Sequence, residues 1–200
     1  MPAYARGMGR ALLIVDVQND FTEDGALAVK GGDAVAIGVT RYLAEHARDY
    51  DAIVASRDWH DAAGDNGGHF AEDPDFVDSW PVHCVANTPG SEYDPWFDAA
   101  SVTHHVKKGQ GIPAYSMFEG ATDAGESVDD VLAGADIDAV DVVGLATDHC
   151  VLATSRDALS RGLSVRILTD LVAGVAPDAS AAALEELQAS GAALATGDAR

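Results

Sequence analysis

The feature that most constrains the fold is an apolar run, Ala11–Val17, which only Asp16 interrupts. Such a run is typical of a strand buried on both faces of a parallel sheet, because a strand with one wet face alternates apolar and polar residues. Further strand-like runs follow along the chain. The strands that we predict are residues 11–17, 52–56, 102–107, 139–145, 164–169 and 192–196.

Helix-like segments separate most of these strands, at residues 34–48, 127–135, 148–161 and 179–189. Asp33 is expected to cap the first helix and Gly162 to close the third. Strands that alternate with helices specify a parallel sheet with right-handed crossovers. We therefore predict an α/β fold of three layers, a six-stranded and mainly parallel sheet with helices on both faces. Without a repeat or a linker, residues 1–200 are expected to be a single domain, with 1–9 a loosely ordered extension.

The composition excludes several classes of protein. The chain has 200 residues, 48% of them hydrophobic, which is enough for one globular core. No apolar run reaches the ~18 residues of a membrane span, and residues 1–10 lack the apolar core of a secretory signal. Twelve Lys and Arg against 33 Asp and Glu give a net charge of −21. Since such a surface repels phosphates and anionic lipids, we expect no nucleic acid or membrane partner. Because neither a membrane span nor a secretory signal is found, we expect a cytoplasmic protein.

The acidity is dispersed along the chain rather than gathered in a tail, and only 3 of the 12 basic residues are Lys. Dispersed acidity is typical of a protein kept soluble at high salt, where self-repulsion is screened. The sequence therefore indicates a salt-rich cytoplasm. An acidic protein of an ordinary cytoplasm is the alternative.

Three reactive side chains lie near the carboxyl ends of predicted strands, the edge at which open α/β sheets bind ligands. They are Asp16, Lys108 and Cys150. Asp16 either holds a loop through backbone N–H groups or acts as a base with a raised pKa. Cys150 is either a buried core thiol or a nucleophile at a helix N-terminus, where a thiolate is stabilised. A carboxylate, an ammonium group and a thiol on one edge favour nucleophilic acyl transfer.

Residues 57–101 show little periodicity, and a segment that long without regular structure is usually functional. Asp58 and His60 project to the same side of an extended chain, and His69 and His83 follow in the same segment. One carboxylate with two or three imidazoles suits Zn²⁺, Fe²⁺ or Mn²⁺. Solvated loop histidines are the alternative.

Six segments of the chain, in order, resemble the signature segments of nicotinamidases, which are cysteine hydrolases of the isochorismatase-like superfamily. They are Leu12–Phe21, Ser56–His60, Trp80–His83, Lys108–Gly109, Ala114–Gly120 and Gly144–Cys150. Each segment alone is a weak signal, but the combination is specific and spans nearly the whole chain. The fold that the resemblance implies, a six-stranded parallel sheet flanked by helices, agrees with the pattern above.

The resemblance also implies the roles of site residues. The implied catalytic triad is Asp16, Lys108 and Cys150, and the implied metal ligands are Asp58, His60 and His83. His69 resembles a histidine that some family members use as a further ligand, but its loop is about three residues longer here, so its role stays open. Phe21, Trp80 and Tyr115 resemble aromatic walls around a pyridine ring. Leu145–Ala146 resembles a cis peptide that aims the Ala146 N–H at the oxyanion, beside the N–H of Cys150.

We therefore predict a metal-containing amidase that hydrolyses nicotinamide to nicotinate and ammonia in NAD salvage. One divalent metal ion is expected, zinc before iron or manganese. The alternatives are a related amidase acting on a carbamoyl or ureido substrate, and a metal-holding module without catalysis. The sequence leaves open the range of pyridine carboxamides accepted and the oligomeric state, and a homo-oligomer is compatible with it.

Overall fold

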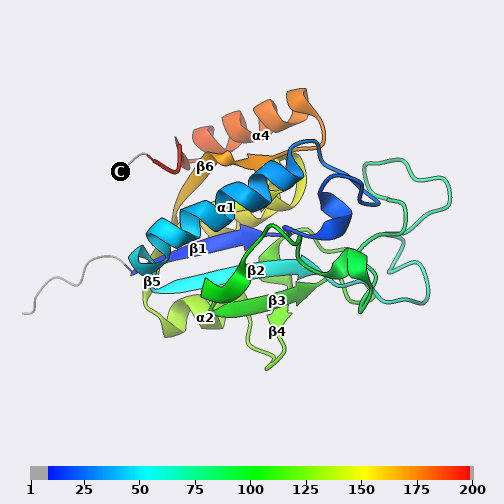
Figure 1. Cartoon of the computed structure of the whole chain (residues 1–200), viewed down its shortest axis with the longest axis horizontal. Helices are drawn as coiled ribbons and strands as arrows, with labels where there is room; N and C mark the ends of the chain where they lie inside the picture. Colours follow the sequence, from blue (N-terminus) through cyan, green and yellow to red (C-terminus); the bar gives the residue numbers. More distant parts are fainter. Residues whose placement is uncertain (1–8, 199–200) are drawn as a thin grey trace, which may run out of the picture.

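The computed structural model describes residues 9–198, and it has the three layers expected from the sequence (Figure 1). The extension predicted over residues 1–9 lies outside this part of the chain, except for Gly9, which begins the first strand. The strands are β1 (Gly9–Val15), β2 (Ala52–Asp58), β3 (His104–Lys108), β4 (Ala121–Thr122), β5 (Ile137–Leu145), β6 (Ser164–Ala173) and β7 (Ala193–Ala195). The helices are α1 (Gly32–His46), α2 (Val128–Gly134), α3 (Leu152–Ser160) and α4 (Pro177–Ala189).

The sheet has seven strands in the order β4-β3-β2-β1-β5-β6-β7, so the predicted number of six is wrong by one. The additional strand, β4, pairs antiparallel with β3. It was missed because two residues are too few to show any alternation of apolar and polar side chains. All other neighbours pair in parallel, which confirms the predicted fold class. The strand order reverses at β1, and in sheets of this kind the ligand binds beyond the carboxyl ends at such a point.

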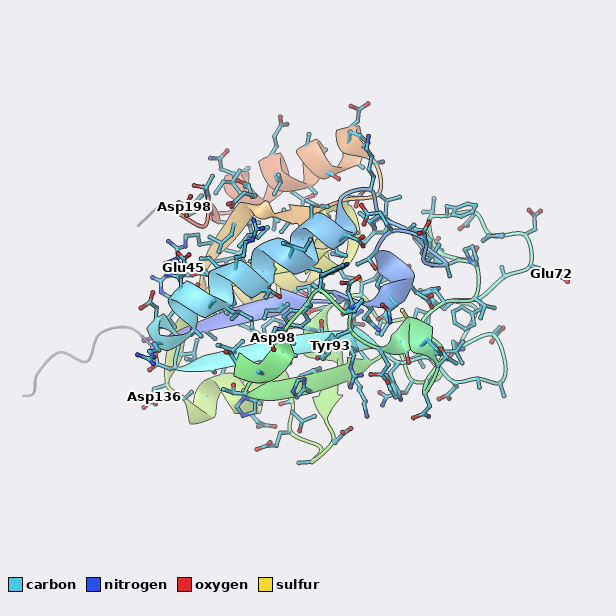
Figure 2. The ribbon with its side chains drawn as sticks, in the orientation of Figure 1. Glu45, Glu72, Tyr93, Asp98, Asp136 and Asp198 are labelled. Carbon is cyan, nitrogen blue, oxygen red and sulfur yellow. The ribbon has the colours of Figure 1, made fainter. Side chains whose placement is uncertain are left out.

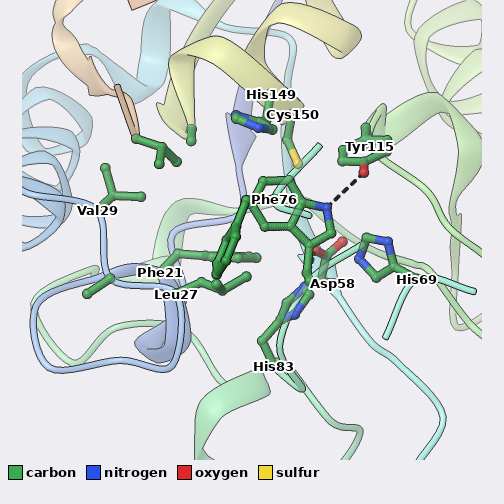
Figure 3. A pocket seen from close by; sticks show the side chains of 14 residues that line it. Phe21, Leu27, Val29, Asp58, His69, Phe76, His83, Tyr115, His149 and Cys150 are labelled. Carbon is green, nitrogen blue, oxygen red and sulfur yellow. Dashed lines mark hydrogen bonds and ion pairs between the residues drawn. The ribbon is translucent and has the colours of Figure 1, made fainter. Parts of the chain in front are cut away.

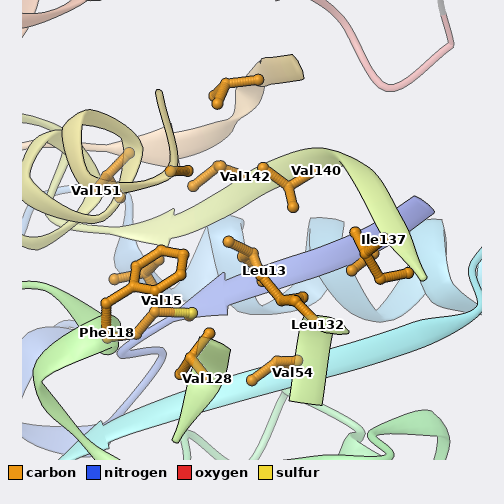
Figure 4. Close-up of a cluster of buried hydrophobic side chains, with 14 of the residues drawn as sticks. Leu13, Val15, Val54, Phe118, Val128, Leu132, Ile137, Val140, Val142 and Val151 are labelled. Atoms are coloured by element: carbon orange, nitrogen blue, oxygen red, sulfur yellow. The ribbon is translucent and has the colours of Figure 1, made fainter. Parts of the chain in front are cut away.

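Two apolar layers hold the helices to the sheet. Leu12 and Ile14 of β1 face α1, whereas Leu13 and Val15 face the layer formed by α2, α3 and α4 (Figure 4). All four side chains are fully buried, which explains the continuous apolar run that revealed this strand. Burying each such side chain contributes about 1.5–3 kcal/mol. The central strand is therefore a rigid support for the residues that follow it.

The first helix begins differently from the prediction. It starts at Gly32, after Gly31 in a left-handed conformation (φ 93°), and Asp33 lies in its first turn rather than at the cap. The carboxylate of Glu23 accepts hydrogen bonds from the N–H groups of Gly31 and Asp33 at 2.8 and 2.6 Å. Glu23 thus caps the start of α1, as was expected of Asp33. The predicted cap is wrong because a side chain from a preceding loop reaches these donors.

The segment predicted as one helix over residues 148–161 has two parts. Thr147–Val151 forms a π-helical turn, and α3 begins only at Leu152. Cys150 therefore lies within a widened turn between β5 and α3. Among residues 9–198, no helix is long and apolar enough to cross a membrane.

The long irregular segment, residues 59–103, extends beyond the carboxyl ends of β1 and β2 (Figure 1). Isolated bridges join Phe70 to Trp80 and His60 to Val85, so this segment folds back on itself. Glu72 lies at the outer end of this segment (Figure 2).

Candidate active site

Three elements bring Asp16, Lys108 and Cys150 together. Asp16 directly follows β1, Lys108 is the last residue of β3, and Cys150 lies in the π-helical turn after β5. The Nζ atom of Lys108 is 2.9 Å from Oδ2 of Asp16 and 3.6 Å from Sγ of Cys150. All three residues are buried. The side chains that the sequence placed at one edge of the sheet thus form a single cluster.

Asp16 is positioned by a residue that the sequence analysis missed. Ser56 of β2 donates a 2.7 Å hydrogen bond to Oδ1 of Asp16 inside the protein. Burial raises the pKa of Asp16, while the Lys108 ammonium acts in the opposite direction. A raised pKa suits a carboxylate that must accept and return a proton near neutral pH.

Burial raises the pKa of the Cys150 thiol well above its ordinary value, which favours the protonated form. Lys108 opposes this rise, and Asp16 and Asp58 add to it. Attack by the sulfur therefore needs a base, and the carboxylate of Asp16 is in the same buried cluster.

Lys108 is a buried ammonium group between two carboxylates. Besides its ion pair with Asp16, Nζ donates to Oδ1 of Asp58 and, at 3.3 Å, to the carbonyl oxygen of Ala114. Burial alone would lower the pKa of Lys108, but Asp16 and Asp58 outweigh it and raise that pKa well above its usual value. Lys108 therefore stays charged, as a buried ion with partners does. It also links the Cys150 thiol to the neighbouring group of histidines.

That group consists of His60, His69 and His83, whose ligand atoms lie within 4.8 Å of one another. Nδ1 of His60 is 2.8 Å from the carbonyl oxygen of Gly109, and Nδ1 of His83 is 2.7 Å from that of Pro81. Since a carbonyl only accepts, both Nδ1 atoms carry hydrogen, so Nε2 is the atom that each ring can offer to a metal ion. Such carbonyl contacts are the usual way in which a protein orients metal-binding histidines.

Asp58 supplies the carboxylate of this group. Its Oδ2 is 3.6 Å from Nε2 of His60 and 3.8 Å from Nε2 of His83. Burial would raise the pKa of Asp58, but Lys108 and His60 outweigh it and hold that pKa below its usual range. Asp58 is therefore an anion.

The residues present fit a divalent metal ion. Nε2 of His60 and Nδ1 of His69 are buried without a hydrogen-bond partner, which would be costly unless something else pairs with them. Burial lowers the pKa of His69 to about 4 and also lowers that of His83, so both rings are neutral and free to act as ligands at neutral pH. One carboxylate and three imidazoles form a donor set typical of Zn²⁺, Fe²⁺ or Mn²⁺. His69, whose role the sequence left open, belongs to this set by position.

A cavity of about 230 Å³ joins the two groups (Figure 3). Phe21, Trp80 and Tyr115, expected to be aromatic walls, all line it. Nε1 of Trp80 donates a 2.9 Å hydrogen bond to the hydroxyl oxygen of Tyr115, and Phe21 packs against His83 with ring centroids 5.5 Å apart. The cavity can therefore hold a flat ring between the histidine group and the thiol.

Ala146 and Cys150, the expected oxyanion donors, also line the cavity. The peptide bond between Leu145 and Ala146 is cis, as the resemblance implied. The carbonyl oxygen of Ala146 accepts hydrogen bonds from the N–H groups of His149 and Val151 at 3.0 and 3.1 Å. These bonds fix the backbone on both sides of Cys150.

Sequence reasoning also missed Asp148 and His149. The Asp148 carboxylate accepts hydrogen bonds from the N–H groups of Val175 and Ala176 at 3.0 and 2.9 Å. His149 lines the cavity and meets Trp80 edge-on, with centroids 5.0 Å apart. Their position beside Cys150 was visible in the sequence, but nothing there indicated which way either side chain points.

Comparisons with known proteins agree with this architecture. The model of the isochorismatase domain family matches residues 10–199, and the chain belongs to this family. A curated relative, the nicotinamidase/pyrazinamidase of Mycobacterium tuberculosis, is 49% identical over 179 residues, which cover 90% of this chain and 94% of the relative.

Solved structures give the same result. PnC1 from L. infantum in complex with nicotinate has a TM-score of 0.81 and 31% identity, covering 94% of this chain and 93% of that one. The pyrazinamidase of Pyrococcus horikoshii in complex with zinc has a TM-score of 0.79 and 36% identity, covering 94% of this chain and 98% of that one. The family recognised from six sequence segments is thus confirmed.

Proposed function

We propose that this protein is a nicotinamidase, which hydrolyses nicotinamide to nicotinate and ammonia and so supplies nicotinate for NAD salvage. The observation that carries the proposal is that one cavity joins a buried thiol–carboxylate–ammonium cluster to a group of three histidines and a carboxylate. The first cluster suits cleavage of an amide, and the second suits a ring nitrogen. Relatives named nicotinamidase, such as the Escherichia coli enzyme at 38% identity, support the same activity.

The catalytic steps follow from the positions of the buried groups. Asp16 takes the proton from Cys150 as the sulfur adds to the carboxamide carbon. The backbone N–H groups of Ala146 and Cys150 receive the oxyanion, and each such donor contributes roughly 3 kcal/mol in other acyl-transfer enzymes. Asp16 returns the proton to the departing ammonia, which leaves a thioester on Cys150.

The same groups hydrolyse the thioester, with a water molecule as the nucleophile and the Cys150 sulfur as the leaving group. Asp16 accepts a proton from a water molecule as the water oxygen attacks the thioester carbon, and then gives a proton back to the sulfur. Lys108 stays an ammonium group throughout, because two carboxylates surround it. Its charge limits the repulsion between Asp16, Asp58 and the developing negative charge on the substrate.

Asp58, His60, His69 and His83 would hold a divalent metal ion, and we favour zinc, as in the complex of the P. horikoshii pyrazinamidase. When bound, such an ion supplies a positive partner for the lone pair of a pyridine nitrogen. Phe21, Trp80 and Tyr115 then hold the ring in one orientation, with the carboxamide toward Cys150. Holding the two reacting atoms in this arrangement is itself a large part of the catalysis.

The deciding experiment measures ammonia release by the purified, metal-loaded protein. Nicotinamide should be hydrolysed far faster than benzamide, which lacks the ring nitrogen, and faster than N-carbamoylsarcosine. The last substrate tests the alternative that the protein is an amidase for carbamoyl compounds. An N-carbamoylsarcosine amidase is among the similar structures, with a TM-score of 0.72 and 26% identity. Faster turnover of the carbamoyl compound would overturn the proposal. Elemental analysis of the active protein then identifies the metal, and none at stoichiometric amount would refute the metal site.

A further inference from the structure

The cavity is chemically divided. Asp58, His69 and Cys150 lie on one side and Leu27 and Val29 on the other (Figure 3), and Val175 also lines the cavity. Figure 3 shows Val29 and Leu27 across the cavity from His69 and Tyr115, with Phe76 between the two sides. We call the apolar part of the lining that consists of Leu27, Ala28, Val29, Phe76 and Val175 the outer compartment. The polar side chains Asp58, His69, His83 and His149 belong to the rest of the lining, the inner side.

The outer compartment is also the open side. Phe76 is 57% and Val175 53% exposed, although both are apolar and the chain carries a net charge of −21. The cavity of about 230 Å³ exceeds the ~150 Å³ in which a benzene ring is bound. A pyridine ring with its carboxamide on the inner side therefore leaves apolar surface uncovered toward Leu27, Phe76 and Val175.

The position of the substrate ring determines which of its atoms faces this surface. In the proposed function, on which this inference rests, the ring nitrogen (atom 1) faces the histidines and the carboxamide on carbon 3 faces Cys150. These two ring atoms are separated only by carbon 2, which must then point most deeply into the inner side. Carbon 5 is opposite carbon 2 on the ring. A group on carbon 5 therefore points away from both polar clusters.

We infer that the outer compartment binds an apolar group on carbon 5 of the ring, so that 5-substituted nicotinamides with an aryl or alkyl group are substrates. The side chains that the compartment offers to such a group, Leu27, Val29, Phe76 and Val175, are all apolar. Burying apolar surface there favours binding. A charged group on carbon 5 would lose water without gaining a partner, so the compartment excludes it.

Side-chain carboxylates hold the backbone at two walls of the outer compartment. The loop with Phe76 is held by Asp75, whose Oδ1 accepts hydrogen bonds from the N–H groups of Val77, Asp78 and Ser79 at 2.9–3.0 Å. Val175 is held by the Asp148 carboxylate. The two exposed apolar residues of the compartment, Phe76 and Val175, therefore lie on backbone segments that hydrogen bonds hold in place.

The test compares ammonia release from nicotinamide, 5-phenylnicotinamide, 2-phenylnicotinamide and 5-carboxynicotinamide by the metal-loaded protein. We expect kcat/KM for 5-phenylnicotinamide within about tenfold of that for nicotinamide, and at least 100-fold lower values for the other two compounds. Hydrolysis of nicotinamide with a more than 100-fold loss for 5-phenylnicotinamide would overturn the inference and leave the proposed function standing.

Two variants locate the effect. Val175→Asp and Leu27→Ser each make the compartment polar, and each should lower the ratio of kcat/KM for 5-phenylnicotinamide to that for nicotinamide at least tenfold. The matched control is Ile112→Asp, which adds the same charge at a residue that is 58% exposed and does not line the cavity. Its ratio should stay within twofold of that of the unmodified protein. An unchanged ratio in both compartment variants would refute the inference.

A binding measurement separates this inference from the proposed function. Calorimetry on the metal-loaded Cys150→Ala variant should show a more negative heat-capacity change for 5-phenylnicotinamide than for nicotinamide, since more apolar surface is buried. The difference should shrink when Val175→Asp is added. If nicotinamide is not hydrolysed at all, the proposed function fails, and this measurement still decides what the compartment binds. Equal heat-capacity changes for the two compounds would contradict the inference that the outer compartment binds the group on carbon 5.

Discussion

At the scale of single residues, the site depends on buried charges that hold one another in place. Asp16 was predictable because a carboxylate inside an apolar strand must be paired or must have a raised pKa. Ser56 was not, because a hydroxyl group in a strand usually has no special role and its bond to Asp16 joins residues 40 positions apart. The sequence identifies unusual residues in this way, but it does not identify the ordinary residues that position them.

Replacing Ser56 tests this dependence. The hydrogen bond from Ser56 lowers the pKa of Asp16, so Ser56→Ala should raise that pKa further. Asp16 then becomes protonated at a higher pH, and the acid limb of the kcat/KM profile should move to higher pH. Bonds to charged groups contribute about 1.5–3 kcal/mol, so activity at pH 7 should fall roughly tenfold or more. Profiles over pH 5–9 check this, with Ser56→Thr as the control that keeps the hydroxyl group. An unmoved acid limb in Ser56→Ala would refute the role.

The two cysteines make a matched pair for testing the nucleophile. Cys150→Ala should reduce nicotinamide hydrolysis about 10⁴-fold or more, because a covalent nucleophile is lost, while metal binding is retained. Cys84 is buried too, and burial raises its pKa well above the usual value, but it does not line the cavity. Cys84→Ala should therefore keep most of the activity. Initial rates on equal amounts of metal-loaded protein decide the matter, and comparable rates in the Cys150→Ala variant would exclude the mechanism.

At the scale of elements, the prediction succeeded where local pattern decides and failed where distant contacts decide. The buried strands and the helices were found because their apolar periodicity is local. The path of the long irregular segment could not be predicted, because hydrogen bonds from the distant residue Gln18 help to hold it. This buried side chain donates to the carbonyl oxygens of Asp58 and Ser91 at 2.9 and 3.0 Å and accepts from the N–H of Asp58. No local pattern specifies bonds that join residues 40 and 73 positions apart.

The turn after β3 is expected to control the proposed metal site. Gly109 has φ +79°, and a Cβ atom there would lie 2.6 Å from Cε1 of His60. Gly109→Ala should therefore displace His60 and weaken metal binding about 10- to 100-fold, as the loss of other residues that orient ligands does. Competition with a chelator measures the metal affinity directly. Gly111→Ala is the control, because its φ is +74° but its Cβ would meet Asp61. Equal affinities in the two variants would contradict this role.

The Asp148 carboxylate joins the turn with Cys150 to the start of α4. Burial would raise the pKa of Asp148, but the adjacent His149 ring and hydrogen bonds from two backbone N–H groups lower it to about 2, below its usual value. A lowered pKa means that the stabilisation is fully present above pH about 4 and disappears as the pH falls through about 2. Asp148→Asn should cost about 1–2 kcal/mol at pH 7. Denaturant unfolding at pH 7, 4 and 2 should show this difference shrinking, and a difference that is constant with pH would contradict the assignment.

At the scale of the whole molecule, the fold class followed from composition and alternation, but the strand order did not. The order around β1 is fixed by packing of the two apolar layers, and that packing is collective. The net charge is equally collective. Charged side chains such as Glu45, Glu72, Asp98 and Asp136 lie on separate parts of the surface (Figure 2), so the repulsion is spread over the whole molecule.

The net charge of −21 predicts how stability depends on salt. At ~0.1 M salt the screening length of ~10 Å spans many neighbouring acidic groups, and near 1 M it falls to ~3 Å, so most of the repulsion disappears. The melting temperature should therefore rise by several degrees between 0.1 and 1 M KCl at pH 7, at about 2–4 °C for each kcal/mol. Screening alone saturates near 1 M, whereas a further rise at 2–3 M would indicate salting-out of the apolar core. Thermal unfolding across this series is the measurement, and a melting temperature that is flat or falls up to 1 M would show that the acidity is no adaptation to salt.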